Sequence, residues 1–495
     1  MRAGPLLIAA FALGATACSP PPREGRGVLV IAIDDLRADH VSGLGYDRET
    51  TPELERLAAE GLRFTQTFSA APEVIPAHVA LLTGCDPRLA RRPLLPDGSR
   101  FALVNDWLIP RSVPRLAVEY LASGYATAAF VDHPRVSDLF GFDTGFEEFH
   151  GFTEGRTGDT PNFGFEGVTG RFMRWLRGQD EDRDWFAYLT LGDLGRAWSE
   201  AEPRWAGYFE PRAELAFVPP VTEAARSFFA IANDVWRASD GRLQTLAEYE
   251  ASYDGALRQL DERLGRLFNR LRGIGRWERT TVCVVGSFGI GFGESGLLLD
   301  GGTLSDVDVH VPWILRPAAA ADVERGRNIE ALASTLDLAP TLLELSEIPK
   351  PPGMHGISQL AAGRPGAAAV REHAFSSLGL SEGFSARDAT YSFLRTRPGS
   401  EGPPSLAHSW FGERNPPGDG WREHLRDRRT AGPGSLEPSS ADAEAAAILR
   451  AAGEEWFAWI AHARDAYHPA PWREDAPDPI LRAELVERGL VAAQP

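Results

Sequence analysis

The sequence is 495 residues long, with 43% hydrophobic and 24% charged residues, which is close to the average of soluble globular proteins and argues against a disordered, collagen-like or multi-span membrane protein. Fifty-one basic against 69 acidic residues give a net charge of −18, which repels nucleic-acid phosphates. Three cysteines are too few for a disulfide framework.

The first residues predict an exported protein. Residues 1–17 combine an early positive residue, Arg2, with a short apolar run and small residues, which is the layout of a bacterial secretory signal peptide. Cys18 follows directly and resembles the lipid-carrying cysteine of bacterial lipoproteins, which would anchor the protein to a membrane. In the alternative, cleavage after Ala17 leaves Cys18 as an ordinary terminal residue. Residues 18–27 contain consecutive prolines and are expected to form an extended tether.

The first two elements of the folded part are predicted from local pattern. Val28–Ile33 is a continuous apolar run rich in β-branched residues, which predicts a strand buried on both faces. Thr51 and Pro52 predict the start of a helix, with Thr51 as its N-cap, and Gly61 predicts its end.

The alternation of helix and strand continues along the chain. The predicted elements are a helix over 113–124, strands at Ala126–Val131, Thr280–Val285 and Val311–Leu315, a helix from Tyr253 to Leu271, and a late amphipathic helix over 441–463. Residues 398–440 are rich in Pro, Gly and Ser and are expected to be loop. This order predicts an α/β fold in which helices cover both faces of a mostly parallel sheet. Ligand sites of such sheets lie at the carboxyl ends of strands, here at Asp34-Asp35 and at Gly286-Ser287-Phe288.

Motifs at these two strand ends and beyond resemble the sulfatase family of the alkaline phosphatase superfamily. The similar segments, in chain order, are Val28–His40, Gly45-Tyr46, Thr51–Leu54, Phe64–Phe68, Pro76–Gly84, Gly124–Val131, Gly141–Asp143, Gly291–Glu294, Leu336–Leu345 and Asp478–Val491. The resemblance implies a mostly parallel sheet sandwiched between helices over residues 28–375 and a smaller C-terminal α+β subdomain over residues 376–495.

The resemblance also implies a specific chemistry. Sulfatases convert a cysteine or serine, followed by x-Pro-x-Arg, into formylglycine, whose hydrate attacks the sulfur of a sulfate ester; related phosphoesterases use threonine or serine. A divalent cation, often calcium, holds this nucleophile and a substrate oxygen. Its ligands in the family are two aspartates after the first strand and an Asp-His or Asp-Asn pair after a late strand. The nucleophile needs a lone pair, and the developing negative charge needs a cation or hydrogen-bond donors.

The nucleophile position of this chain holds an aliphatic side chain. Counting back from Pro76, that position is Val74, which has neither a lone pair nor an ionisable proton. Among its neighbours, Cys85 is expected to lie too far along the following helix. Glu73 is expected to be a solvated loop charge, and Ser69 a turn hydroxyl. The catalytic set is therefore predicted to be incomplete.

Half of the cation site is also predicted to be missing. Asp34 and Asp35 match the two aspartates, but the late ligand pair aligns with Ser287 and Phe288. Hard divalent cations prefer about six to eight oxygen ligands, so at most a weak site for calcium or another divalent cation is expected. In the alternative, Asp34 and Asp35 cap the strand end or pair with an arginine such as Arg37.

Further positions depart from the family or from a catalytic role. Thr190 and Gly195 stand where relatives carry two histidines, and Asp300 stands where relatives often carry lysine or histidine. His78 falls at the arginine position of the nucleophile motif and is interpreted either as a residual anion or proton contact or as a packed histidine. His310 is expected to be structural.

The cysteines and tryptophans lie outside the motifs. Cys85 and Cys283 are expected to be two buried thiols, with a disulfide between them as the alternative. The tryptophans Trp198, Trp205 and Trp236 could stack on sugars if they are exposed, but burial is the expected outcome.

Three functions are compatible with these residues. The leading hypothesis is an exported protein of sulfuric ester hydrolase descent that is catalytically degenerate and retains at most recognition of a glycan or another anionic ligand. The first alternative is an active sulfate or phosphate ester hydrolase with an atypical nucleophile. The second is a non-catalytic structural or assembly partner. No nucleic-acid partner is expected.

Overall fold

The computed structural model describes residues 24–90, 107–151, 164–196, 204–205, 207–213, 245–292, 298–299, 304–364, 366–378, 383–396, 422–429 and 442–467. Its largest element is a nine-stranded sheet with the order β10-β2-β9-β6-β1-β5-β3-β4, in which β11 also pairs with β2. The strands are β1 (Gly27–Ile33), β2 (Leu62–Phe68), β3 (Ala126–Phe130), β4 (Glu148–His150), β5 (Trp185–Leu191), β6 (Thr280–Gly286), β9 (His310–Arg316), β10 (Arg327–Ile329) and β11 (Ala333–Ser334).

Most neighbouring strands of this sheet are parallel. β1 lies between β5 and β6 and is parallel to both, and β3 is parallel to β4 and β5. The exception is β9, which runs antiparallel to both of its neighbours, β2 and β6. The predicted mostly parallel sheet is therefore confirmed, with one reversed strand inside it.

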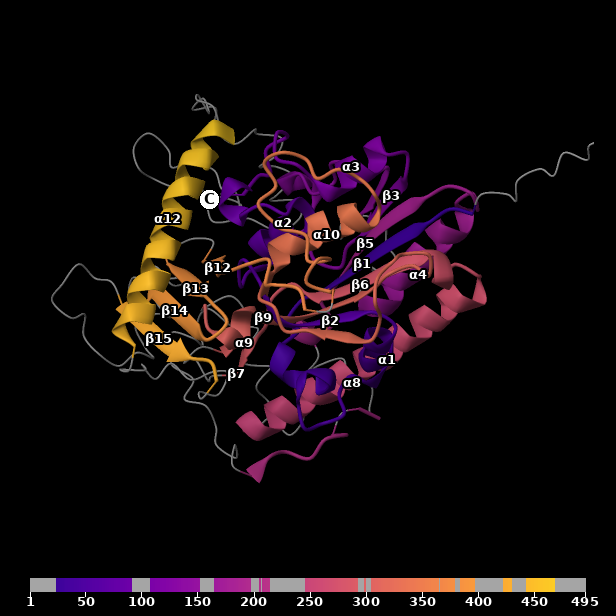
Figure 1. Ribbon diagram of the computed structural model, residues 1–495. Coiled ribbons are helices and arrows are strands. Elements are labelled where there is room, and N and C mark those ends of the chain that lie inside the picture. Colours follow the sequence, from indigo (N-terminus) through magenta and orange to yellow (C-terminus); the bar gives the residue numbers. More distant parts are fainter. Residues whose placement is uncertain are drawn as a thin grey trace, which may run out of the picture.

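Helices cover both faces of the sheet (Figure 1). One face carries α2 (Val74–Thr83), α3 (Leu116–Ala122) and α10 (Leu338–Leu345), and the other carries α1 (Pro52–Ala59), α4 (Gly164–Gly178) and α8 (Leu246–Gly273). Alternate residues of β1 serve the two faces: Val28 and Val30 pack with the first set of helices, whereas Leu29 and Ile31 pack with the second. This double burial explains why β1 has no polar residue.

A second, four-stranded sheet is antiparallel and lies beside α12 (Figure 1). Its strands are β12 (Ala374–Ser377), β13 (Phe384–Arg387), β14 (Tyr391–Thr396) and β15 (Arg422–Asp427), and the helix is α12 (Ala443–Tyr467). Phe384, Phe393 and Leu425 form a small core with Leu449 of α12. The remaining short elements are α9 (Asp306–Val309) and the pair β7 (Gly291–Phe292) and β8 (Leu298–Leu299).

Two local predictions are wrong. Residues 398–440 were expected to be loop, but Arg422–Asp427 form β15, an edge strand whose charged residues are compatible with one solvated side. Thr51 was expected to cap α1, but its hydroxyl forms a hydrogen bond with Ser42 instead. The cap is Asp261 of α8, which accepts hydrogen bonds from the first backbone N–H groups of α1 at 2.8 and 2.9 Å.

Several predictions fall on residues that the structure does not describe. They include the signal peptide at 1–17, Cys18, Asp300, Trp198, Trp236 and the segment Asp478–Val491. Within the described part of the chain, no helix has both the length and the apolar character that crossing a membrane requires.

Candidate active site

Two neighbouring strand ends bring the predicted site residues together. Ile33 of β1 and Gly286 of β6 are register partners, so the residues that follow, Asp34 and Ser287, leave the sheet side by side. The backbone N–H of Ser287 donates to the carbonyl of Ile33 at 2.9 Å. Asp34 is 2% exposed and Ser287 is fully buried. The edge of the sheet therefore presents a buried carboxylate next to a buried hydroxyl.

Asp35 occupies an unusual backbone conformation. Its φ of +62° lies in the left-handed region, which residues other than glycine seldom adopt and which aspartate tolerates better than most. The hydroxyl of Tyr253 on α8 donates to the Asp35 carbonyl at 2.7 Å, which helps to hold this turn. The turn places the two successive carboxylates of Asp34 and Asp35 at the same strand end.

Asp34 is the centre of a buried hydrogen-bond network. Its Oδ1 lies 2.9 Å from Nε2 of His78 and also accepts a hydrogen bond from the Ser287 hydroxyl. Nδ1 of His78 lies 2.6 Å from the hydroxyl of Tyr188 on β5. Because a carboxylate can only accept, Nε2 of His78 carries the hydrogen of its bond to Asp34. The network joins β1, α2, β5 and β6 around one charge.

The network controls the protonation of its members. Burial alone raises the pKa of Asp34, but the electrostatic attraction and hydrogen bond of His78, with smaller contributions from His133 and Ser287, outweigh burial and lower the pKa below its ordinary value. Burial and the nearby Asp34 charge raise the pKa of Tyr188 well above its ordinary value. Asp34 is therefore a carboxylate and Tyr188 a phenol at neutral pH.

Val74, the residue at the nucleophile position, is the first residue of α2. Its side chain is 4% exposed and belongs to the apolar cluster under α2, α3 and α10. It supplies packing and no lone pair.

The neighbouring nucleophile candidates do not replace Val74. The Ser69 hydroxyl is buried and is engaged by the carbonyls of Ala71 and Ser287. Burial raises the pKa of the Cys85 thiol to about 12, so it is not a thiolate at neutral pH. Glu73 is half-buried at the N-cap of α2, rather than a fully solvated loop charge. Cys85 and Cys283 are both free and buried, which confirms two separate thiols.

The two replaced histidine positions have new roles. The Thr190 hydroxyl accepts a hydrogen bond from the backbone N–H of Asp132 at 2.8 Å. Gly195 lies against Asp35, so closely that a Cβ atom at Gly195 would be 2.3 Å from the Asp35 Oδ2 atom. A histidine at position 195 would therefore require Asp35 to move.

Other predicted residues are structural in the described part of the chain. His310 begins β9, and its Nε2 donates to the carbonyl of Thr65 at 2.9 Å while its ring stacks on Phe68. Trp205 is 3% exposed, which confirms burial for that tryptophan. Arg37, considered as a partner of the two aspartates, forms a salt bridge with Asp39 at 2.7 Å.

The donor atoms at the strand ends do not fit a tightly bound calcium ion. Asp34 and Asp35 offer carboxylates, and Oδ2 of Asp34 is buried without a hydrogen-bond partner among the described residues. Ser287 donates its proton to Asp34, and Phe288, which is fully buried, has no donor atom. Two carboxylates and one hydroxyl fall short of the oxygen-rich shell that calcium prefers.

The structure also brings together a cluster that sequence reasoning missed. Within the described residues, one group of three metal-ligating side chains has donor atoms close enough to share an ion: His40, Glu250 and Asp254. Tyr188 and Tyr253 were missed as well. The sequence held one signal for the cluster, because Glu250 and Asp254 are four residues apart, a spacing that places both on one face of a helix, but the helix predicted from Tyr253 did not reach Glu250.

Comparison with known families gives a match over most of the chain. The family model described as Sulfatase matches residues 26–348. This range includes the sheet, α2 and both strand ends of the candidate site.

Sequence comparison finds sulfatases of animals and bacteria. Human arylsulfatase A is 26% identical over 372 residues, covering 70% of this chain and 68% of the relative. N-acetylglucosamine-6-O-sulfatase of Bacteroides thetaiotaomicron is 21% identical over 436 residues, covering 72% of this chain and 75% of the relative. An extracellular sulfatase Sulf-1 homologue of Caenorhabditis elegans is 23% identical over 340 residues, covering 62% of this chain and only 46% of that longer relative.

Solved structures show the same fold. Phosphonate monoester hydrolase of Agrobacterium radiobacter superposes with a TM-score of 0.63 at 20% identity, covering 88% of this chain and 96% of the other. A 2-O GAG sulfatase superposes with a TM-score of 0.63 at 17% identity, covering 93% of this chain and 96% of the other.

Proposed function

This chain belongs to the sulfatase family, and from that premise we propose that its ancestral centre no longer hydrolyses esters and retains at most the recognition of an anionic ligand. The family match covers residues 26–348, which include every residue of the candidate site.

The observation that carries the proposal is the side chain of Val74. It stands where the resemblance places the attacking atom, at the first residue of α2, and it is buried in an apolar cluster. A nucleophile requires a lone pair, which valine lacks. Cys85 is held as a neutral thiol, and the Ser69 hydroxyl is engaged by backbone carbonyls.

The surroundings of Asp34 support the same conclusion. His78 and Ser287 both bind Oδ1 of Asp34, so protein hydrogen bonds stabilise this charge. The Asp35 carboxylate fills the space that a side chain at position 195 would need, where relatives carry a histidine and this chain has Gly195. Protein groups therefore occupy one oxygen of Asp34, and two adjacent carboxylates without a strong cation repel the sulfate or phosphate group of a substrate.

A ligand role rests on what remains of the centre and on the relatives. The N-terminal turn of α2 has backbone N–H groups at Val74 and Ile75, though none at Pro76, and the dipole end that favours negative charge. One solved structure of the same fold is described as a complex with its substrate D-glucosamine-2-N,6-O-disulfate. We propose a sulfated or otherwise anionic glycan as the ligand class. We also propose that residues 1–17 direct export and that a lipid anchor at Cys18 holds the protein in the bacterial cell envelope.

A working hydrolase is the second candidate, and one observation favours it. Oδ2 of Asp34 is buried and lacks a hydrogen-bond partner among the described residues, so it could hold a water molecule or a weakly bound cation. Such a water would have to act as the attacking group in place of the missing side chain.

Turnover of aryl sulfates and aryl phosphates by the purified chain decides between the two candidates. The assay includes added calcium, magnesium or zinc, a chelator control, and a variant with Asp34→Ala and Asp35→Ala. We expect no activity above that of the variant under any of these conditions. Hydrolysis by the wild type that disappears in the variant would overturn the proposal. A rise in melting temperature with sulfated glucosamine would support ligand recognition, and no shift with any anionic sugar would leave only a structural role.

A further inference from the structure

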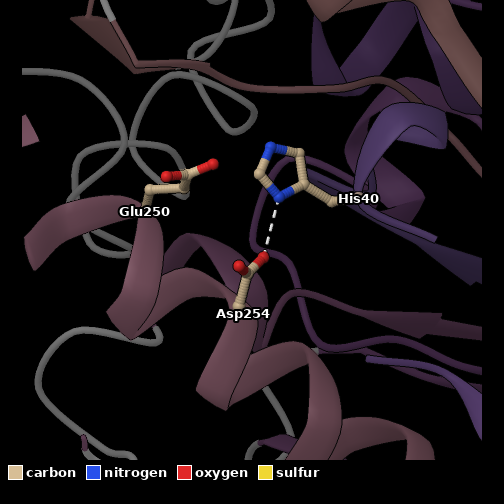
Figure 2. A group of neighbouring side chains, drawn as sticks. All are labelled: His40, Glu250 and Asp254. Carbon is tan, nitrogen blue, oxygen red and sulfur yellow. Dashed lines mark hydrogen bonds and ion pairs between the residues drawn. The ribbon is translucent and has the colours of Figure 1, made fainter. Parts of the chain in front are cut away.

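We propose that His40 and Glu250, with Asp254 orienting the histidine, form a divalent-cation site of the zinc type that is separate from the Asp34–Asp35 centre. Donor atoms of the three residues all lie within 4.8 Å of one another. Two ligands of one zinc ion, each at about 2.1 Å, lie at most about 4 Å apart, so only a small closure is needed. Figure 2 shows Asp254 at one ring nitrogen of His40 and the Glu250 carboxylate beside the same ring.

The fold brings these residues together from distant parts of the chain. His40 ends the short 3-10 helix Ala38–His40, which follows the Asp34–Asp35 turn. Glu250 and Asp254 lie one helical turn apart on α8 and therefore on the same face. All three are buried, with exposures of 4% for His40, 7% for Glu250 and 0% for Asp254.

His40 is held in the orientation that a metal-binding histidine usually has. Its Nδ1 lies 2.7 Å from Oδ1 of Asp254. When Nδ1 donates to this carboxylate, Nε2 keeps its lone pair and can bind a metal ion, which is the arrangement found around most metal-ligating histidines. The ring is also fixed by packing, because Tyr46, Tyr253 and Phe292 have ring centroids 4.5, 5.2 and 5.3 Å away.

Glu250 offers an oxygen that the protein does not satisfy. Its Oε1 lies 3.2 Å from the Tyr46 hydroxyl, whose shorter hydrogen bond goes to Oδ2 of Asp254 at 2.6 Å, and 3.3 Å from Nε of Arg212. Its Oε2 is buried without a hydrogen-bond partner among the described residues. A buried carboxylate oxygen without a partner is costly, and a bound cation would supply one.

The charge around the cluster leaves room for a cation. Arg48 binds Oδ2 of Asp254 at 2.7 Å, and Arg212 binds Asp47 through its guanidinium group. These five contacting groups comprise three carboxylates, Asp47, Glu250 and Asp254, and two guanidinium groups, Arg48 and Arg212. The carboxylates therefore outnumber the guanidinium groups by one, and a divalent ion would offset that negative charge.

The site would brace the segment that carries the ancestral centre. Tyr253, which packs against His40, also donates a hydrogen bond to the Asp35 carbonyl at 2.7 Å. An ion shared by His40 and Glu250 would tie the chain after β1 to α8. Imidazole and carboxylate donors together suit zinc better than calcium, which prefers oxygen alone.

Zinc binding to the full chain tests the proposal. Metal-free protein is titrated with Zn²⁺ by calorimetry, and the metal content is measured after dialysis. We expect one bound ion per chain at a defined stoichiometry, with the affinity lowered at least about tenfold by Glu250→Gln. The matched control is Glu262→Gln, a more exposed carboxylate on the same helix, which should leave the affinity unchanged. The variant with Asp34→Asn and Asp35→Asn should also keep the ion, which separates this site from the ancestral centre.

Several results would overturn the proposal. They are the absence of stoichiometric zinc in the wild type, an unchanged affinity in Glu250→Gln, or loss of the ion in the Asp34→Asn, Asp35→Asn variant only. If Glu250→Gln does not fold, the wild type decides through its Co²⁺ form. The visible absorption of that form should report a low-symmetry site with a nitrogen ligand, and a spectrum identical to hydrated Co²⁺ would contradict the assignment.

Discussion

His78→Leu tests the Asp34 network more directly than any other single substitution. The leucine removes the hydrogen bond to Oδ1 of Asp34 while it fills most of the space of the imidazole, so the main change is electrostatic. His78 is fully buried and Asp34 is 2% exposed, which places the pair in the range where removal of one partner costs about 3–5 kcal/mol. We expect the free energy of unfolding to fall by that amount at neutral pH.

The loss of stability in His78→Leu should depend on pH, and its direction follows from the pKa of Asp34. In the wild type the pKa of Asp34 is lowered despite its burial, so its stabilising contribution is present above the ordinary value of 3.8 and is lost as the pH falls through the folded value. Without His78, burial dominates and raises the pKa of Asp34. The destabilisation caused by His78→Leu should therefore be larger at about pH 7 than at about pH 4.

Urea denaturation of both proteins at the two pH values measures this difference, with and without a chelator. The matched control is the double variant Asp34→Asn with His78→Leu, which should recover about 2 kcal/mol because no buried charge is left unpaired. A loss below about 1 kcal/mol, a loss that is independent of pH, or a stability that depends on added calcium would refute the view that His78 and Ser287 stabilise Asp34 in place of a cation.

Other groups give independent predictions. Burial raises the pKa of Asp261 to about 7, so the free energy of unfolding should fall as the pH rises from about 4 to 7. Urea titrations of Asp261→Asn should lack this fall with pH, and an unchanged pH dependence would contradict the assignment. Burial raises the pKa of Asp306, but the surrounding arginines outweigh it and lower the pKa to about 2. The wild type should therefore lose about 2 kcal/mol between about pH 4 and pH 2 that Asp306→Asn does not lose, as acid denaturation would show. Burial raises the pKa of Cys85 and Cys283 to about 12. Mass mapping should therefore find both thiols unmodified by a thiol reagent in the native protein and modified after unfolding. Rapid labelling of the native protein would be inconsistent with their burial.

The buried elements of the fold were predictable because their patterns are local. The apolar run of β1 required burial on both faces, and the structure divides its side chains between two cores. The errors occur where a distant residue decides the outcome. Asp261 on α8 replaces Thr51 as the cap of α1, and β15 forms because β14 offers it a partner, not because its own residues favour a strand.

The candidate site was likewise predictable where its residues follow from local pattern and not where distant residues meet. Adjacent parallel strands made it predictable that Asp34 and Ser287 would lie together. The partners of His78 could not be predicted, because Tyr188 is separated from it by 110 residues and points inward from another strand. His40 and Asp254 are 214 residues apart, and only the fold places them in contact.

The most direct test of the central claim is the rate of aryl sulfate hydrolysis by the wild type relative to the variant with Asp34→Ala and Asp35→Ala, measured with calcium in excess. Without a lone pair at position 74, the account predicts that the two rates are equal and match the uncatalysed reaction. A wild-type rate well above that of the variant would contradict it.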